Sequence, residues 1–250
     1  MISSLNDLRI VPLERLILHE AHDPDRLDRL RGRMEAEGVQ RNPVIVAPHG
    51  EDYLVLDGAH RFQTLKELGC DLILVQTTEP PDIAESWGHI VDEGLLPGFR
   101  GVGEVETSYG DSWLARVTSS GSEEVLLEAR GEGLAAEVEA LWGLRRVYPE
   151  GVVRRVDSEA PVELEAGEAM IRYRPFTPRE LVEVVRLGKV LPAGITRFRV
   201  RERVLGVRFP LEKLRDGVPE KRNEELKNFV RKFWRENRIR YYGEPVVLFE

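Results

Sequence analysis

Residues 57–61, which read Asp-Gly-Ala-His-Arg, constrain the fold more than any other segment of the chain. They lie between an apolar run typical of a strand, residues 53–56, and a run typical of a helix, residues 62–68. A strand that ends in a glycine turn and opens onto a helix exposes several backbone N–H groups on one side. The helix dipole adds partial positive charge there and Arg61 adds a full one, so this glycine turn suits a phosphate. The alternative is that Asp57 caps the helix and Arg61 is solvated, because short motifs often match by chance.

Two carboxylates in this half of the chain are candidates for chemistry. Asp57, at the start of the glycine turn, could serve Mg²⁺ or orient a reacting group. Glu20 follows a strand-like run, residues 13–18, and precedes a helix start at Asp23, where Asp23 can act as N-cap and Pro24 as the first helical residue. A carboxylate in that position could take a proton from a hydroxyl. The alternative for Glu20 is an ordinary exposed glutamate.

A third segment, residues 191–198, reads Leu-Pro-Ala-Gly-Ile-Thr-Arg-Phe. A proline–glycine turn followed by Thr196 and Arg197 can offer backbone N–H groups, a hydroxyl and a guanidinium to one carboxylate. The alternative is an ordinary turn that leads into a strand.

The chain has 250 residues, which is enough for one large domain or two small ones. Residues 79–82, Glu-Pro-Pro-Asp, interrupt the pattern and predict a boundary, with domains at 1–80 and 81–250. Before the boundary we expect strands at 8–11, 43–47, 53–56 and 72–77 around a helix that starts at Asp23. After it we expect strands at 102–106, 113–117, 124–127, 198–200 and 204–207, and helices at 133–142, 178–187 and 221–238. The predicted fold class is α+β.

Charge and residue usage exclude several classes of function. A net charge of −8 argues against general nucleic-acid binding, since affinity for a phosphate backbone comes from an excess of Lys and Arg. The basic amphipathic helix at 221–238 is interpreted as a docking or homodimer helix, because its apolar face needs a protein partner. Cys70 is the single cysteine, which excludes an intramolecular disulfide and a cysteine-based metal cluster. The five histidines lack the helical pairing of zinc proteases.

No stretch of the sequence approaches the roughly 18 apolar residues of a membrane span. Residues 1–7 lack the basic head and apolar core of a signal peptide. We therefore expect a cytoplasmic protein without a membrane partner.

Together, Leu-His-Glu at 18–20, Pro-Val-Ile-Val at 43–46 and the glycine turn resemble the N-terminal domain of the free L-serine kinases. These kinases belong to the ParB/sulfiredoxin-like superfamily and use ATP or ADP. Residues 192–197 are similar to their C-terminal substrate-binding turn. The resemblance implies a ParB/sulfiredoxin-like nucleotide-binding domain at 1–80, followed by a C-terminal α+β domain at 81–250 that completes the serine site.

The resemblance also implies a function and residue roles. The expected reaction is in-line phosphoryl transfer from a Mg²⁺-bound nucleotide to the hydroxyl of free L-serine. The implied roles are catalytic base for Glu20, support of the metal and reacting groups for Asp57, nucleotide phosphate binding for Gly58, Ala59, His60 and Arg61, and serine binding for Trp87, Thr196 and Arg197. Ala59 stands where these kinases often have a histidine, and Ala193 and Phe198 replace a common proline and histidine.

Rival functions within the superfamily differ in the residues that they need. Sulfiredoxin needs a cysteine in its glycine turn, and Ala59 at that position excludes a thiol mechanism. A DNA-partition protein of the ParB type needs a helix-turn-helix and a basic face, and the sequence indicates neither. A non-catalytic, ParB-like nucleotide-binding regulatory protein stays open as the alternative, because it would keep the glycine turn without needing Glu20.

Overall fold

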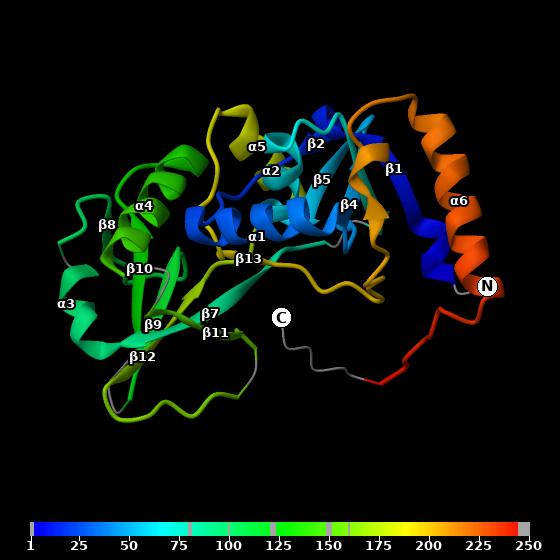
Figure 1. Cartoon of the computed structure of the whole chain (residues 1–250). Coiled ribbons are helices and arrows are strands. Elements are labelled where there is room, and N and C mark those ends of the chain that lie inside the picture. The colour runs from blue at the N-terminus through cyan, green and yellow to red at the C-terminus, as the bar shows by residue number, and fades with distance from the viewer. Residues whose placement is uncertain are drawn as a thin grey trace.

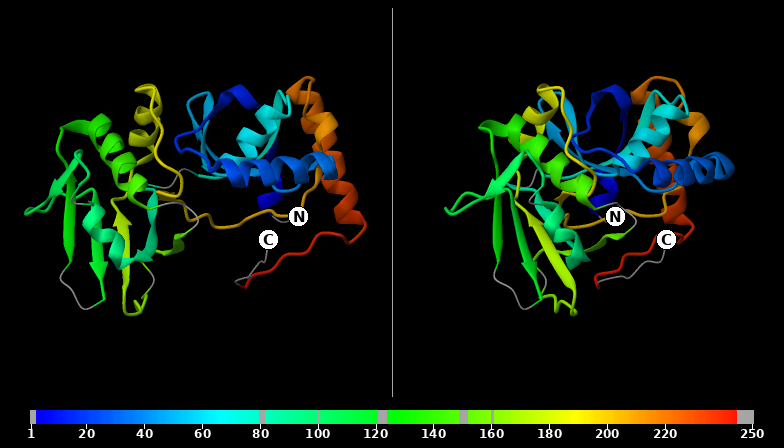
Figure 2. Two further views of the ribbon diagram at one scale, coloured as in Figure 1. Left: turned by 60° about the vertical axis from the view of Figure 1, so that its left-hand side comes forward. Right: turned by 90° about the vertical axis from the view of Figure 1, so that its left-hand side faces the viewer.

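The computed structural model describes residues 3–79, 82–99, 101–120, 124–148, 152–159 and 161–244 (Figure 1). Two sheets lie side by side, one built from the first third of the chain and the other from the middle (Figures 1 and 2). The predicted α+β class is therefore confirmed. Among the described residues, the helices are all too short or too polar to cross a membrane.

The first sheet has five strands in the order β1-β6-β4-β5-β2. Its strands are β1 (Leu8–Pro12), β2 (Leu16–Ile17), β4 (Val44–His49), β5 (Asp52–Asp57) and β6 (Leu72–Thr77). Strand β4 runs parallel to β6 and antiparallel to β5, while β2 runs parallel to β5. Helices α1 (Pro24–Glu37) and α2 (Ala59–Glu67) pack on this sheet through buried side chains such as Met34 and Leu65. The predicted strand, glycine turn and helix at residues 53–68 are present.

Local signals fix both ends of α1. The side chain of Asp23 accepts a hydrogen bond from the Asp25 N–H at 3.0 Å, and Pro24 is the first helical residue. Gly38 ends the helix in the left-handed conformation, with φ of 64°. These caps confirm the helix start predicted at Asp23.

The second sheet has seven strands, six of them in the order β11-β7-β12-β9-β10-β8, with β13 also paired to β7. Its strands are β7 (Glu85–Asp92), β8 (Val105–Thr107), β9 (Ala115–Ser119), β10 (Val125–Ala129), β11 (Arg154–Asp157), β12 (Glu168–Tyr173) and β13 (Thr196–Arg197). Helices α4 (Gly133–Val147) and α5 (Pro178–Arg186) contribute buried residues to the same core, and the short α3 (Leu96–Phe99) lies nearby. The sequence did not predict β7 and β12, because polar residues break their apolar pattern.

The remaining elements are short. They are β3 (Val39–Gln40), β14 (Phe209–Pro210) and the 3₁₀ turns Ser3–Asp7, Leu13–Arg15, Glu93–Leu95 and Leu211–Lys213. Residues 198–208 form an extended linker that runs from the second sheet back to the first (Figure 2). The strands predicted at 198–200 and 204–207 are therefore wrong. Arginines in this linker bond to carboxylates, as Arg199 does to Glu85 at 2.9 Å, and no strand pairing is described there.

After the linker, the chain returns to the core of the first sheet. Strand β14 pairs with β3, and α6 (Pro219–Arg235) packs against β1. Leu226 and Val230 on the apolar face of α6 are buried in that core, and the Asn223 side chain bonds to the backbone of Ile10 at 2.9 and 2.7 Å. This face of the basic helix therefore docks on the chain's own sheet, while a homodimer stays a prediction.

The boundary predicted at residues 79–82 centres on Pro80 and Pro81, which lie outside the described residues. The division into 1–80 and 81–250 stays a prediction. The structure adds one fact that the sequence did not indicate, namely that residues 209–235 contribute to the core of the first sheet.

We expect Leu226→Ala to lower the free energy of unfolding by about 2–5 kcal/mol, because it removes buried methyl groups between α6 and the first sheet. The matched control is Lys227→Ala on the neighbouring residue, whose exposed pair with Glu224 should contribute less than about 1 kcal/mol. Urea denaturation measures both. Equal stability of the two variants would contradict the docking of α6 through Leu226.

Candidate active site

A single backbone bridge brings Glu20 to the turn at residues 192–197. Glu20 and Leu191 form an isolated parallel bridge, in which the Leu191 N–H donates to the His19 carbonyl and the Ala21 N–H donates to the Leu191 carbonyl, both at 2.8 Å. Residues 19–21 leave the first sheet, whereas residue 191 precedes β13 of the second. The bridge therefore places the end of the strand-like run predicted at 13–18 directly beside the third segment singled out in the sequence.

The Glu20 carboxylate is the acceptor of three hydrogen bonds from that turn. Its Oε1 accepts from the Ile195 N–H at 2.8 Å, the Thr196 N–H at 2.9 Å and the Thr196 hydroxyl at 3.2 Å. These contacts join residues 175 and 176 positions apart in the chain. Glu20 is therefore not the ordinary exposed glutamate of the alternative interpretation.

Burial raises the pKa of Glu20 to about 7. The Thr196 N–H, the charge of Arg155 and the N–H groups of Ile195 and Gly194 all oppose this rise, but desolvation outweighs them. A carboxylate with a pKa near neutrality can accept a proton and release it again at physiological pH, which is what a general base requires.

His19 holds the Thr196 hydroxyl from the other side. The His19 Nε2 lies 3.0 Å from Thr196 Oγ1, and the His19 ring meets Phe198 edge-on at 5.8 Å. Burial lowers the pKa of His19 to about 4, so the ring is neutral at pH 7. Thr196 is therefore fixed between His19 and Glu20, a contact that the Leu-His-Glu segment did not reveal in the sequence.

The glycine turn has the geometry that its sequence predicts. Gly58 is the N-cap of α2 with φ of 113°, and a Cβ there would lie 3.1 Å from both the Arg61 side chain and Val44 Cγ2. The first N–H groups of α2, from Ala59 onward, have no intrahelical acceptor. They project out of the N-terminal end of the helix. The turn thus offers backbone donors and partial positive charge to an anion.

Asp57 pairs with two arginines instead of capping α2. Its Oδ2 lies 3.3 Å from Arg61 Nη2 and also accepts a hydrogen bond from Arg203 of the linker. Burial alone would raise the pKa of Asp57, but the charges of Arg61 and Arg203 outweigh it and hold this pKa below its usual value. Arg61 also donates to the Pro43 carbonyl, so it is not merely solvated. The capped-helix alternative is therefore wrong for both residues.

His60 ties the glycine turn to the start of α1. Its Nε2 accepts a hydrogen bond from the Asp23 N–H at 3.0 Å, and its ring lies 6.4 Å from that of His22. Burial, followed by the charge of Arg26, lowers the pKa of His60 to about 4. A neutral His60 therefore holds the glycine turn close to the segment that carries Glu20.

Trp87 and Arg197 also lie together, next to Thr196. The Arg197 guanidinium is 4.9 Å from the centre of the Trp87 ring, and its Nη1 is 2.6 Å from Asp157 and 3.6 Å from Glu85. Two carboxylates of the chain itself therefore already balance the charge of Arg197. A carboxylate ligand at this arginine would have to share it with Asp157 and Glu85.

His89 supports the turn from the second sheet. Its Nε2 lies 2.8 Å from the Gly194 carbonyl oxygen and its Nδ1 lies 2.9 Å from the Tyr148 hydroxyl. Burial, followed by the charge of Arg145, lowers the pKa of His89 to about 3. Sequence reasoning missed this residue, because no local pattern marks a histidine that bonds to a backbone 105 residues away.

A cavity of about 210 Å³ opens beside the bridge between Glu20 and Leu191. It is lined by residues 21–24, by side chains from the end of α4, and by Pro192 and Ala193. A second hollow, of about 380 Å³, lies along α6 and is remote from the glycine turn. The smaller cavity therefore borders the segment after Glu20 and the start of the turn at residues 192–197.

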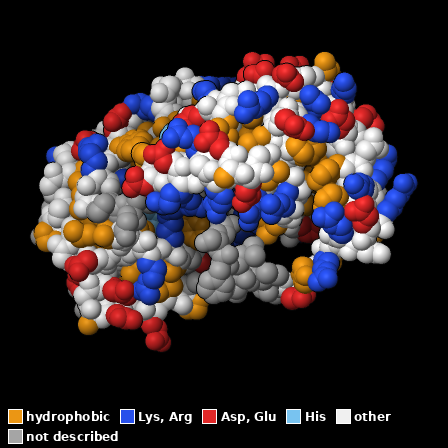
Figure 3. All heavy atoms as spheres, viewed as in Figure 1, with side chains coloured by type: hydrophobic (Ala, Val, Ile, Leu, Met, Phe, Trp, Pro, Cys, Tyr) orange, Lys and Arg blue, Asp and Glu red, His pale blue; other side chains and the backbone are white. Residues whose placement is uncertain are grey.

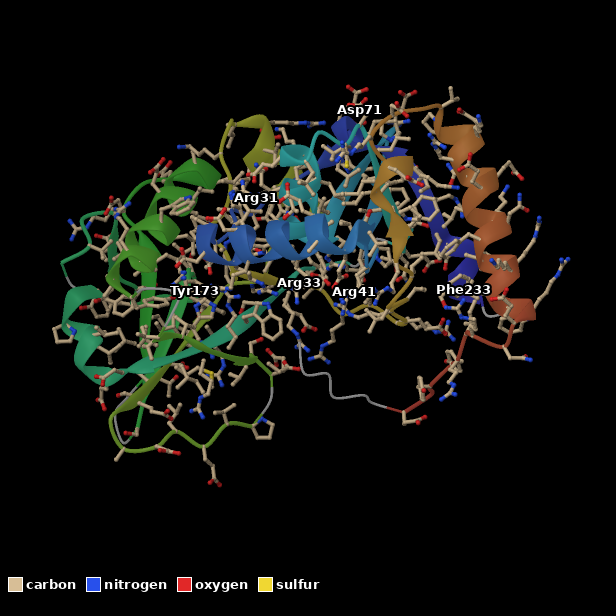
Figure 4. All side chains as sticks on the ribbon, in the orientation of Figure 1. Arg31, Arg33, Arg41, Asp71, Tyr173 and Phe233 are labelled. Atoms are coloured by element: carbon tan, nitrogen blue, oxygen red, sulfur yellow. The ribbon has the colours of Figure 1, made fainter. Side chains whose placement is uncertain are left out.

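Positive charge gathers along one edge of α1, although the whole chain carries a net charge of −8. Lys and Arg side chains form a band below α1 in Figure 3, and Figure 4 places Arg33 and Arg41 there, with Arg31 on the opposite edge. A local field of this sign favours the approach of an anionic ligand.

No group of three His, Cys, Asp or Glu side chains suited to a metal ion comes together within the described residues. Mg²⁺, however, is usually held by one or two carboxylates together with the phosphates of a substrate. Asp57 is a single carboxylate at the glycine turn, which fits a metal carried by a nucleotide and does not fit a dedicated protein cage.

Known proteins are similar to the chain in sequence and in fold. No protein-family model matches the chain. The chain is 30% identical to the ATP-dependent L-serine kinase SbnI of Staphylococcus aureus over 97% of both sequences. Its fold is similar to that of SbnI with a C-terminal truncation, with a TM-score of 0.79 and 23% identity over 94% of this chain and all of that one.

A free serine kinase solved in complex with AMP has a similar fold as well, with a TM-score of 0.65 and 18% identity over 83% of this chain and 93% of that one. The solved structures show the fold, and the sequence match over nearly the full length of both chains shows the family. The resemblance carried by Leu-His-Glu, the glycine turn and residues 192–197 is thereby confirmed. The chain belongs to the L-serine kinase family.

Proposed function

We propose that the protein phosphorylates free L-serine to O-phospho-L-serine, with a Mg²⁺-bound nucleotide as donor and Glu20 as the base. The observation that carries this proposal is the Glu20 carboxylate itself, which has a pKa of about 7 and is held by the turn at residues 192–197. A serine hydroxyl needs a base near the phosphoryl donor, and Glu20 lies next to the segment that His60 ties to the glycine turn.

The two oxygens of Glu20 would have different tasks. Three hydrogen bonds that hold the carboxylate, two from backbone N–H groups and one from the Thr196 hydroxyl, end on Oε1. We therefore assign Oε2 to the serine hydroxyl. Because Oε1 is fixed by two backbone N–H groups, the orientation of Oε2 is set before serine binds, and this lowers the entropic cost of the reaction.

The glycine turn is the proposed site for the nucleotide phosphates. Gly58 and Ala59 would offer backbone N–H groups, His60 would keep the turn in place, and Arg61 would contribute a charged donor. Support comes from the AMP that a solved kinase of similar fold contains and from the name of the relative in Staphylococcus aureus, which points to ATP as donor. Mg²⁺ supplies charge neutralisation between phosphate oxygens when it is bound, and Asp57 is the residue that would hold it.

The amino-acid end of the site is assigned to Thr196, Arg197 and Trp87. Thr196 and Arg197 would face the serine carboxylate, and Trp87 would form an apolar wall behind the Arg197 guanidinium. The pairs of Arg197 with Asp157 and Glu85 fix its orientation, so that a remaining N–H can meet the substrate.

In the transfer itself, the oxygen of serine attacks the terminal phosphorus in line with the leaving nucleotide, which is ADP when ATP is the donor. The O–P bond to serine forms, the bond to the leaving oxygen breaks, and the hydroxyl proton passes to Glu20. Positioning and neutralisation of charge supply most of the rate enhancement in reactions of this class.

Glu20→Gln should lose turnover by at least about a hundredfold and keep its nucleotide affinity, because the amide can still accept the bonds to Oε1 but cannot take a proton. O-phosphoserine production from ATP, Mg²⁺ and serine measures turnover, and calorimetry measures affinity. Glu51→Gln, in an exposed turn, is the matched control and should behave like the parent. Unchanged turnover in Glu20→Gln would remove Glu20 from the mechanism.

Arg61→Ala should weaken nucleotide binding about ten- to a hundredfold, the loss expected when a charge-assisted phosphate contact is removed. Arg31→Ala is the control, since Arg31 is paired with Asp28 and Glu67 on the opposite edge of α1. Calorimetric titration with ATP gives both dissociation constants, and thermal melting shows that the fold is kept. Equal ATP affinities in the two variants would mean that Arg61 contacts only Asp57 and the Pro43 carbonyl and does not bind the phosphates.

A further inference from the structure

Arg155 occupies a central position that no sequence motif indicated. It lies on β11, which pairs antiparallel with β7, and its register partner is His89. His89 in turn bonds to the carbonyl oxygen of Gly194. The pair of strands therefore presents Arg155 to the same turn, residues 192–197, that holds Glu20.

The Arg155 guanidinium lies against the backbone of Gly194. A Cβ added to Gly194 would overlap with three atoms of the guanidinium group, Nη2, Cζ and Nε, the last at 2.6 Å. Gly194 also has φ of 77°, a conformation that side chains other than glycine rarely adopt. Both facts show that the turn is shaped to admit this cation at close range.

The charge of the same group also acts on residues of the site. The charge of Arg155 acts on the Glu20 carboxylate, where it favours the ionised form, and on His60 in the glycine turn. The contact with Gly194, which directly precedes the Ile195 and Thr196 N–H groups that hold Glu20, therefore places the Arg155 guanidinium on the same turn as the base.

We propose that Arg155 is a further catalytic residue, which neutralises the phosphoryl group while it passes from the nucleotide to serine. This inference rests on the proposed function. As the bond from phosphorus to the leaving nucleotide breaks and the bond to the serine oxygen forms, negative charge is spread over the phosphoryl oxygens and the hydroxyl proton moves to Glu20. A guanidinium offers donors to two of those oxygens and remains charged throughout.

The test compares Arg155→Gln and Arg155→Lys with Arg154→Gln. Arg154 is the neighbouring residue on β11, but its side chain is more than half exposed and pairs with Glu168 at 2.8 Å. Turnover, the KM for serine and the dissociation constant for ATP are measured for each variant, together with its melting temperature. Added guanidinium chloride is then tested as a rescue agent on Arg155→Gln.

For Arg155→Gln we expect kcat to fall about 10³-fold or more, as it does for other arginines that neutralise a transferred phosphoryl group. Both the serine KM and the ATP affinity should stay within about threefold of the parent. Guanidinium at millimolar concentration should restore part of kcat, which a purely structural role would not explain. Arg155→Lys keeps the charge without the planar fork, so its kcat should fall about tenfold or more. The kcat of Arg154→Gln should match that of the parent.

Two results would overturn the assignment. One is parental turnover in Arg155→Lys and in a folded Arg155→Gln, and the other is a raised serine KM at unchanged kcat, which would make Arg155 a carboxylate-binding residue. If Arg155→Gln does not fold, the kcat of Arg155→Lys alone tests the assignment, and a parental kcat in that variant overturns it. The parent enzyme separates this inference from the proposed function, because a parent that makes no O-phosphoserine refutes both, whereas an active parent with active variants refutes only the role of Arg155.

Discussion

The hydrogen bonds from the Ile195 and Thr196 N–H groups to Glu20 are the interaction on which the rest of the site depends. A carboxylate withdrawn from water is costly unless donors replace its hydration, and here the donors come from the other end of the chain. The first and second sheets must therefore meet for Glu20 to be satisfied. Since burial still raises the pKa of Glu20 to about 7, the same contact that joins the sheets also prepares a base.

Arginine–carboxylate pairs surround this contact and fix the groups beside it. Arg203 reaches from the linker to Asp57 at the glycine turn, and Arg197 meets Asp157 on β11. Partly exposed pairs of this kind contribute little to the free energy of unfolding. Their value is in orientation, because they hold side chains of both sheets in the places where a nucleotide and an amino acid would bind.

Local signals made a large part of this structure predictable. The cap at Asp23, the stop at Gly38 and the glycine turn are set by neighbouring residues, so the sequence alone indicated α1, α2 and the position of Glu20. Strands β7 and β12 were not predicted because polar residues break their apolar pattern, so that only their pairing with each other, far apart in the chain, defines them. The linker was mistaken for strands, since alternating arginines that bond to distant carboxylates have the same period as a strand. Arg155 has no local signature at all, and only the pairing of β11 with β7 places it beside Gly194.

The most direct test of the central claim is a pH titration of the Glu20 carboxyl carbon by NMR, with Glu20→Gln used to assign its signal. If the turn at residues 192–197 buries this carboxylate as described, the titration midpoint should lie near pH 7. The physical reason is desolvation, which the hydrogen bonds of Ile195 and Thr196 only partly offset. A midpoint at about 4.5, the ordinary value for glutamate, would contradict the claim that the meeting of the two sheets creates the base.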